Sequence, residues 1–146
     1  MNYQIAKELY DKAEEEFSNA QEELARPSAD VVSYSVCLAA RRALHHYLNS
    51  LYTLYAYEND ETREDPLTVT ELIKKCQKYD DRIENLDFSC VRCKDRDVLS
   101  EGEIYFCDDI NQIMACNNMA KQVRQLILEK VENNESQSQY FSSTQK

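Results

Sequence analysis

The sequence is poor in the residues that form tight turns, because its 146 residues include one glycine and two prolines. β-Hairpins and Gly-rich phosphate loops need glycine at fixed positions, so this composition argues against sandwiches, barrels, Walker-type loops and dinucleotide-binding folds. The length suits one hydrophobic core and excludes a second large domain. We predict an all-α fold over residues 1–132, an antiparallel up-and-down bundle of four main helices with one or two short helices.

Positive charge and long apolar runs are also scarce. Lysine and arginine number 17 against 27 acidic residues, which gives a formal net charge of -10. Such a surface repels polyanions, which argues against broad nucleic-acid binding. Residues 1–24 form an acidic amphipathic pattern instead of an apolar run. We therefore expect no signal peptide, no membrane partner and a cytoplasmic location.

The cysteines do not have the dense spacing of a small secreted disulfide scaffold, so we expect reduced thiols. Cys90 and Cys93 form a CxxC pair that Cys107 and Cys116 could complete as a four-thiolate zinc site. However, the later cysteines lack the paired spacing of a zinc motif, and Cys116 lies in an apolar helical stripe. We expect structural cysteines and no cofactor, with Cys90, Cys93 and Cys107 as the metal candidates.

Apolar residues recur every three or four positions in four stretches, the pattern of helices that bury one face. The first helix should end near Ala25, because Pro27 cannot continue it. The third should begin at a capping box formed by Thr68 and Glu71. We place the other helices at residues 3–25, 31–57 and about 106–131.

Polar segments separate these helices. Residues 58–65 carry five acids and one base without a structural period, which predicts a solvated loop. Residues 80–88 fit either a kinked continuation of the third helix or a short helix, and residues 94–103 are typical of a polar loop. Residues 133–146 have little to bury and are predicted to form a disordered tail.

The second helix holds the side chains best suited to chemistry. Residues 31–57 contain no acid and both histidines of the protein. Arginine donates to phosphate and histidine transfers protons near neutral pH, as nucleotide binding or metal-independent RNA cleavage requires. The candidate ligand-binding residues are Arg41, Arg42, His45, His46 and Tyr47.

Within this set, Arg41 and His46 frame the string Arg, four residues, His, Tyr. Five positions on a helix separate two side chains by about 140°, whereas residues four apart share one side. Arg42 and His46 are therefore the candidate catalytic pair. The alternative is that these side chains lie at the rim of a buried helix and bond tyrosine hydroxyls, or acids of the loop and the first helix. The helix is apolar over more than half its circumference, so it should touch two neighbours, or one neighbour and a second subunit.

The order of helices and three motifs resemble the HEPN domain over about residues 3–131. The motifs are Tyr-x-x-Ala-x-x-x-Tyr from Tyr3, the second-helix segment from Tyr34 to Tyr52, and Thr-Glu-Leu-Ile from Thr70. The resemblance implies a helical bundle, often a homodimer, in a family of toxin ribonucleases, nucleotidyltransferase partners and non-catalytic binding modules. Catalytic members carry an arginine and, a few residues later, a histidine near the start of the last main helix. Residues 89–131 contain no histidine, so this chain departs from that pattern.

Two hypotheses follow. The favoured one is a non-catalytic HEPN-like domain that dimerises, docks a partner such as a nucleotidyltransferase or an antitoxin, or binds a nucleotide or another anion. The alternative is a metal-independent, toxin-like ribonuclease in which the Arg/His residues of two subunits meet across a dimer.

Overall fold

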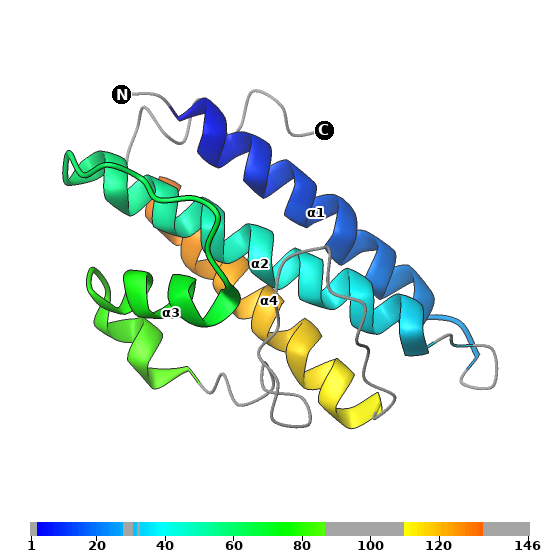
Figure 1. Cartoon of the computed structure of the whole chain (residues 1–146). Coiled ribbons are helices and arrows are strands. Elements are labelled where there is room, and N and C mark those ends of the chain that lie inside the picture. The colour runs from blue at the N-terminus through cyan, green and yellow to red at the C-terminus, as the bar shows by residue number, and fades with distance from the viewer. Residues whose placement is uncertain (1–2, 28–30, 32, 87–109, 133–146) are drawn as a thin grey trace.

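The computed structural model describes residues 3–27, 31, 33–86 and 110–132. Within these ranges the chain is helical and contains no strand, as the sequence predicts. The elements are α1 (Gln4–Leu24), α2 (Ser33–Glu58), α3 (Val69–Gln77), the 3-10 helix η2 (Asp81–Asn85) and α4 (Ile110–Glu132) (Figure 1). The predicted polar loop at 94–103, the tail at 133–146 and the metal candidates Cys90, Cys93 and Cys107 lie outside the described residues.

Helix α1 packs closely along α2 because its buried stripe is built on small side chains. Ala6, Ala13 and Ala20 are fully buried and lie seven residues apart. At one end of the pair, the Ser50 hydroxyl donates to the carbonyl of Ala6 over 2.7 Å. At the other end, Ala20 packs in one apolar cluster with Val36. The two helices therefore run antiparallel.

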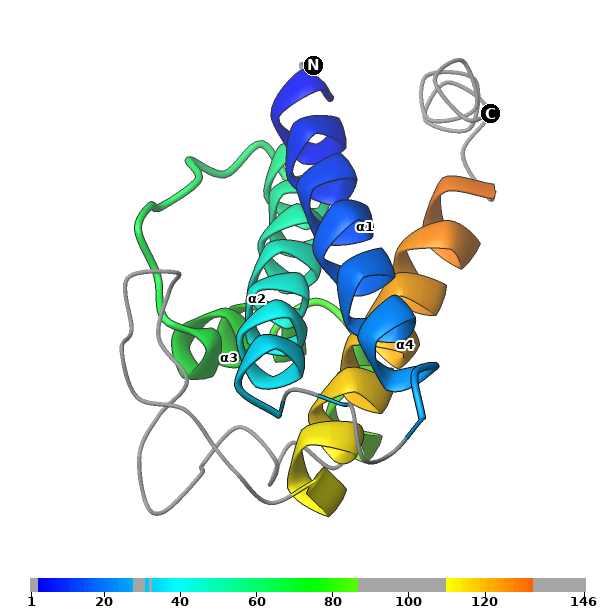
Figure 2. The same ribbon diagram turned by 90° about the vertical axis from the view of Figure 1, so that its right-hand side faces the viewer.

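Helix α2 is the centre of the molecule and contacts α1, α3 and α4 (Figure 2). This agrees with the prediction that so apolar a helix meets more than one neighbour. The inward arc of α2 is buried throughout, and its members are Cys37, Ala40, Leu44, Tyr47, Leu51 and Leu54. Burial of these side chains contributes to the hydrophobic stabilisation of the domain.

The capping box predicted for the third helix is present. The Glu71 amide donates to the Thr68 hydroxyl over 3.1 Å, and the Thr68 amide donates to the Glu71 carboxylate over 2.9 Å. Leu72 is fully buried and Leu67 packs against the core as a half-buried side chain. Two of the orphan amides at the helix start are thus satisfied, which explains why α3 begins at Val69.

Residues 59–68, here called the strap, lead from the end of α2 back along its length. The Glu64 amide donates to the Tyr52 hydroxyl over 2.8 Å, and farther along the strap the Leu67 carbonyl lies 2.8 Å from Nε2 of His45. After the strap, α3 advances in the same sense as α2. Its Cys76 thiol lies 3.8 Å from the Leu48 carbonyl.

Helix α4 runs antiparallel to α1. Its Asn117 donates to Gln21 over 2.7 Å, and its Arg124 donates to Glu14 over 2.5 Å. The strap runs back along α2, so α3 then runs in the same direction as α2. Because α2 and α4 are both antiparallel to α1, α2, α3 and α4 share a direction. Alternation of direction through all four helices is therefore not confirmed, although the all-helical bundle is. None of the described helices is long and apolar enough to cross a membrane.

Candidate functional site

The five candidate residues of α2 do not form one site. Successive residues of a helix point about 100° apart, and the segment from Arg41 to Tyr47 spreads its polar groups around the helix. Arg41, His45 and Tyr47 are buried, whereas Arg42 and His46 are half-buried. Each of the residues described below has a different set of neighbours, and these neighbours show what it can do.

Tyr47 ties three helices together. Its hydroxyl donates to Oε1 of Glu14 over 2.5 Å, and the same oxygen accepts from Nε of Arg124 over 2.5 Å. Desolvation and the bond to Glu14 raise the pKa of Tyr47 far above its ordinary value. Burial, followed by the neighbouring Glu14 charge, raises the pKa of Tyr10 to about 12. The hydroxyl of Tyr47 is therefore a neutral structural donor with its acceptor already in place.

His45 holds the end of the strap. Its Nε2 lies 2.8 Å from the carbonyl oxygen of Leu67, which can only accept, so Nε2 carries the proton. The ring is buried and meets the ring of His46 edge to face, with centroids 5.7 Å apart. His45 thus connects α2 to the residue just before the capping box of α3.

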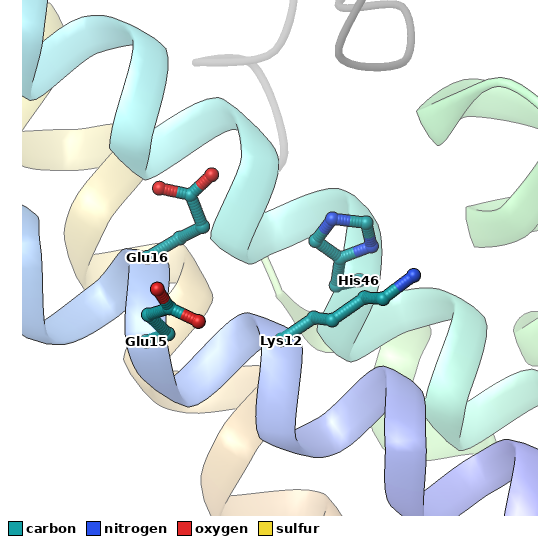
Figure 3. Close-up of a pocket in the computed structure, with 4 residues that line it drawn as sticks. All are labelled: Lys12, Glu15, Glu16 and His46. Carbon is teal, nitrogen blue, oxygen red and sulfur yellow. The ribbon is translucent and has the colours of Figure 1, made fainter.

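Arg42 and His46 face α1, on one side of α2 as the spacing predicts. Nη1 of Arg42 lies 3.5 Å from Oε2 of Glu16. His46 lines a small open pocket of about 160 Å³ with Lys12, Glu15 and Glu16 (Figure 3). In the close-up, Lys12, Glu15 and Glu16 come from α1 and His46 comes from α2. Glu16 therefore borders both members of the candidate catalytic pair.

This geometry disfavours a phosphate ligand. Two carboxylates offset the positive charges of Lys12 and Arg42, so the pocket has little net attraction for an anion. Pockets for drug-sized ligands enclose about 300–1,000 Å³, and this one is smaller. The guanidinium of Arg42 is already paired with Glu16. Arginine recognises a phosphate by directing two N–H donors at that one anion, so the pair with Glu16 competes with such binding.

No group of three or more histidine, cysteine or acidic side chains suited to a metal occurs in the part of the chain that the structure describes. Cys37, Cys76 and Cys116 are buried. Desolvation raises the pKa of the Cys76 thiol, so it stays protonated and unsuited to metal ligation. These three cysteines act as small apolar side chains of the core.

Sequence reasoning missed the residues that hold the polar groups in place. Glu14 and Glu16 lie at the two edges of the apolar stripe of α1, each about 80° from its centre. Arg124 lies at the edge of the apolar arc of α4, about 20° around the helix from the buried residues Ile113 and Val131. A single arginine at the edge of such an arc indicates a carboxylate on the facing helix, and Glu14 is that partner.

Comparison of the chain with protein-family models, with curated proteins and with solved structures finds no match. The side chains described above and the resemblance of three motifs to HEPN domains therefore remain as indications of function.

Proposed function

We propose that this chain is a non-catalytic HEPN-like helical domain that acts by binding a partner protein, a second copy of itself included. The observation that carries the proposal is the ion pair between Arg42 and Glu16, 3.5 Å apart. The one arginine that shares a side of α2 with His46 is engaged by α1 of its own chain. A ribonuclease would need that guanidinium on the scissile phosphate.

The other candidate residues support the same proposal. Tyr47 and His45 have intramolecular partners in Glu14 and Leu67. Their bonds fasten α1 and the strap to α2, so the polar residues of this helix serve the fold. The outer surface of the bundle is therefore the part available for function. Such a surface suits binding of a partner protein better than catalysis.

The test is incubation of purified, metal-free protein with mixed RNA, beside the variants Arg42→Ala and His46→Ala. Arg26→Ala is the matched control, because Arg26 is an exposed arginine that pairs with Glu23 at the end of α1. We expect no cleavage by any of the four proteins and no thermal stabilisation by nucleotides. Cleavage that is lost in both Arg42→Ala and His46→Ala, but kept in Arg26→Ala, would overturn the proposal in favour of a ribonuclease.

Nucleotide binding is distinguished in the same samples. A nucleotide-dependent rise in melting temperature that Arg42→Ala abolishes would show an anion site on α2, contrary to the proposed docking role. Light scattering during size-exclusion chromatography reports whether the protein is a monomer or a dimer. That measurement tests whether a second copy of the chain is the partner.

A further inference from the structure

The first 19 residues of helix α4 present an outward surface that contains no acidic residue, and Glu129 and Glu132 follow at the end of the helix. Residues 110–128 include neither aspartate nor glutamate, although the whole chain has a net charge of -10. Eight side chains of this stretch are exposed, here called the α4 face: Ile110, Asn111, Met114, Ala115, Asn118, Lys121, Gln122 and Gln125. Figure 2 shows α4 at the outer edge of the bundle, with α1 and α2 beside it.

The neighbouring long helix, α1, is different. The exposed residues of α1 include Glu8, Asp11, Glu15 and Glu22. The acid-free stretch of α2 is mostly buried and offers little surface. Two copies of this chain would repel one another if they met through α1, because like charges face each other there. Among the surfaces of the described long helices, the α4 face is the one on which like-charge repulsion between two copies would be smallest.

The chemistry of the α4 face suits a copy of itself. Asn111, Asn118, Gln122 and Gln125 follow the alternating three- and four-residue spacing of a helix that pairs with another helix. Each primary amide both donates and accepts hydrogen bonds, so an amide stripe can satisfy an identical stripe. A stripe of charges of one sign could not do so, since a two-fold interface brings the same patch of both subunits together.

The α4 face also carries the exposed apolar side chains. Among the described residues, Ile110 and Met114 are the exposed large hydrophobic side chains, at 38% and 47% of their full accessibility. They lie four positions apart on one side of α4, and the unbranched Met114 adapts its shape to a partner. Burying both would add a hydrophobic contribution to the hydrogen bonds of the amides.

We propose that two copies of the chain pair through the α4 face, with α4 antiparallel to its copy about a two-fold axis near Asn118. Asn118 stands at the middle of the stripe from Asn111 to Gln125, so it lies opposite its own copy. The same symmetry places Asn111 opposite Gln125 and Met114 opposite Gln122. This inference rests on the proposed binding function and names its partner, a second copy.

The pairing of residue 118 with itself allows a charge-swap test. Asn118→Glu places two carboxylates across the axis, and Asn118→Lys places two ammonium groups there. We expect each variant alone to raise the dissociation constant of the dimer by about tenfold or more. An equimolar mixture should restore the dimer, because glutamate then lies opposite lysine. Sedimentation velocity over a range of protein concentrations measures these constants.

Asn19→Glu is the matched control. Asn19 is an exposed asparagine in the second half of α1, so this variant adds the same charge to another face. We expect its dissociation constant to stay within about twofold of that of the unsubstituted protein, since distant surface changes have small effects. Circular dichroism and melting temperature show whether all three variants keep the fold.

The result that overturns the inference is a monomer at every concentration, or a dimer that neither residue-118 variant weakens. A mixture of Asn118→Glu and Asn118→Lys that stays monomeric would also overturn it, because residue 118 would then not face itself. These failures are separate from failure of the proposed function, which depends on RNA cleavage and nucleotide binding. A chain that neither cleaves RNA nor dimerises would keep the docking role and lose only this interface.

Discussion

Individual side chains show how one short segment is divided among several structural roles. The stretch from Arg41 to Tyr47 supplies a hydroxyl to Glu14, an imidazole donor to Leu67 and a guanidinium to Glu16. Two neighbouring elements, α1 and the strap, are therefore held by residues that a linear motif groups together. A motif defined along the chain does not distinguish these roles, because a helix turns each residue toward a different neighbour.

The Glu14 carboxylate is the side chain whose loss should be felt most among these polar contacts. Glu14→Ala removes the acceptor of both the Tyr47 hydroxyl and the Arg124 guanidinium. We expect the free energy of unfolding to fall by about 1–3 kcal/mol, because a buried donor is left unsatisfied. Urea unfolding followed by circular dichroism measures this change.

Glu15→Ala is the control for this prediction, since Glu15 is an exposed glutamate next along the same helix. It should change the stability by no more than about 0.5 kcal/mol. Equal losses in the two variants would show that the contacts of Glu14 contribute nothing beyond those of a surface acid.

Among the elements, the strap differs most from what its composition indicates. Residues 59–68 are polar and mostly exposed, in keeping with the predicted loop. However, the side chain of Arg63 is only 15% exposed and reaches the polar side of α2. Its Nε donates to the Thr53 hydroxyl over 2.7 Å, and its Nη2 donates to the Asn49 side chain over 3.0 Å. Lys75 and Lys78 of the α3 region pair with Glu64 and Glu61 of the strap.

Arg63 should therefore hold the strap in place. In Arg63→Ala, the buried Asn49 and Thr53 lose a charged donor, and we expect a loss of stability of about 1–3 kcal/mol. In the unsubstituted protein the Glu64 amide donates to the Tyr52 hydroxyl. In Arg63→Ala we expect faster hydrogen exchange of this amide. Exchange followed by mass spectrometry resolves this segment from the rest of the chain.

Arg26→Ala again provides the comparison, because the Arg26 side chain is 51% exposed and pairs with Glu23 at the end of α1. Exchange in the strap should be unchanged in that variant. If Arg63→Ala also leaves the strap protected, then the lysine–glutamate pairs hold it without the arginine.

For the whole molecule, one end of the bundle is joined by a polar cluster of α2, η2 and α4. The Tyr55 hydroxyl donates to Asp80 over 2.6 Å, and Arg82 bonds both Asp80 and Glu129. The ammonium of Lys130 pairs with Glu58 over 2.5 Å and lies 4.5 Å from the centre of the Tyr55 ring. Burial would raise the pKa of Asp80, but the bonds from Arg82 and Tyr55 outweigh it and lower that pKa to about 2.

The lowered pKa of Asp80 makes the stability of the molecule sensitive to acid. The unfolded carboxyl takes up a proton at a higher pH than the folded one, so this contribution is fully present above about pH 4 and is lost toward about pH 2. Asp80→Asn should be less stable than the unsubstituted protein at neutral pH, and the difference should shrink as the pH falls through this window. Urea unfolding at a series of pH values measures it.

The exposed neighbour Asp81 gives the control, as Asp81→Asn should change stability little at any pH in the series. A difference between Asp80→Asn and the unsubstituted protein that is constant down to about pH 2 would contradict the assignment of this pH dependence to Asp80.

The helices themselves could be predicted well from the sequence. Pro27, the capping box at Thr68 and the periodic apolar residues place the ends of α1, α2 and the start of α3 within a few positions. These signals are local, because caps and periodicity act through residues within one or two turns. The buried arc of α2 and the shared side of Arg42 and His46 follow from the same helical geometry.

The partners of the polar side chains depended on tertiary packing. Glu14 meets Arg124, Arg63 meets Asn49, and Tyr55 meets Asp80 only because distant segments lie side by side. The direction of α3 has the same origin, since the strap returns along α2 before that helix begins. Periodicity shows which face of a helix is buried but carries no information about which element covers it. The composition of the chain thus specified its helices and its acidic surface, whereas the roles of Arg42, His45, His46 and Tyr47 were set by the segments packed against them.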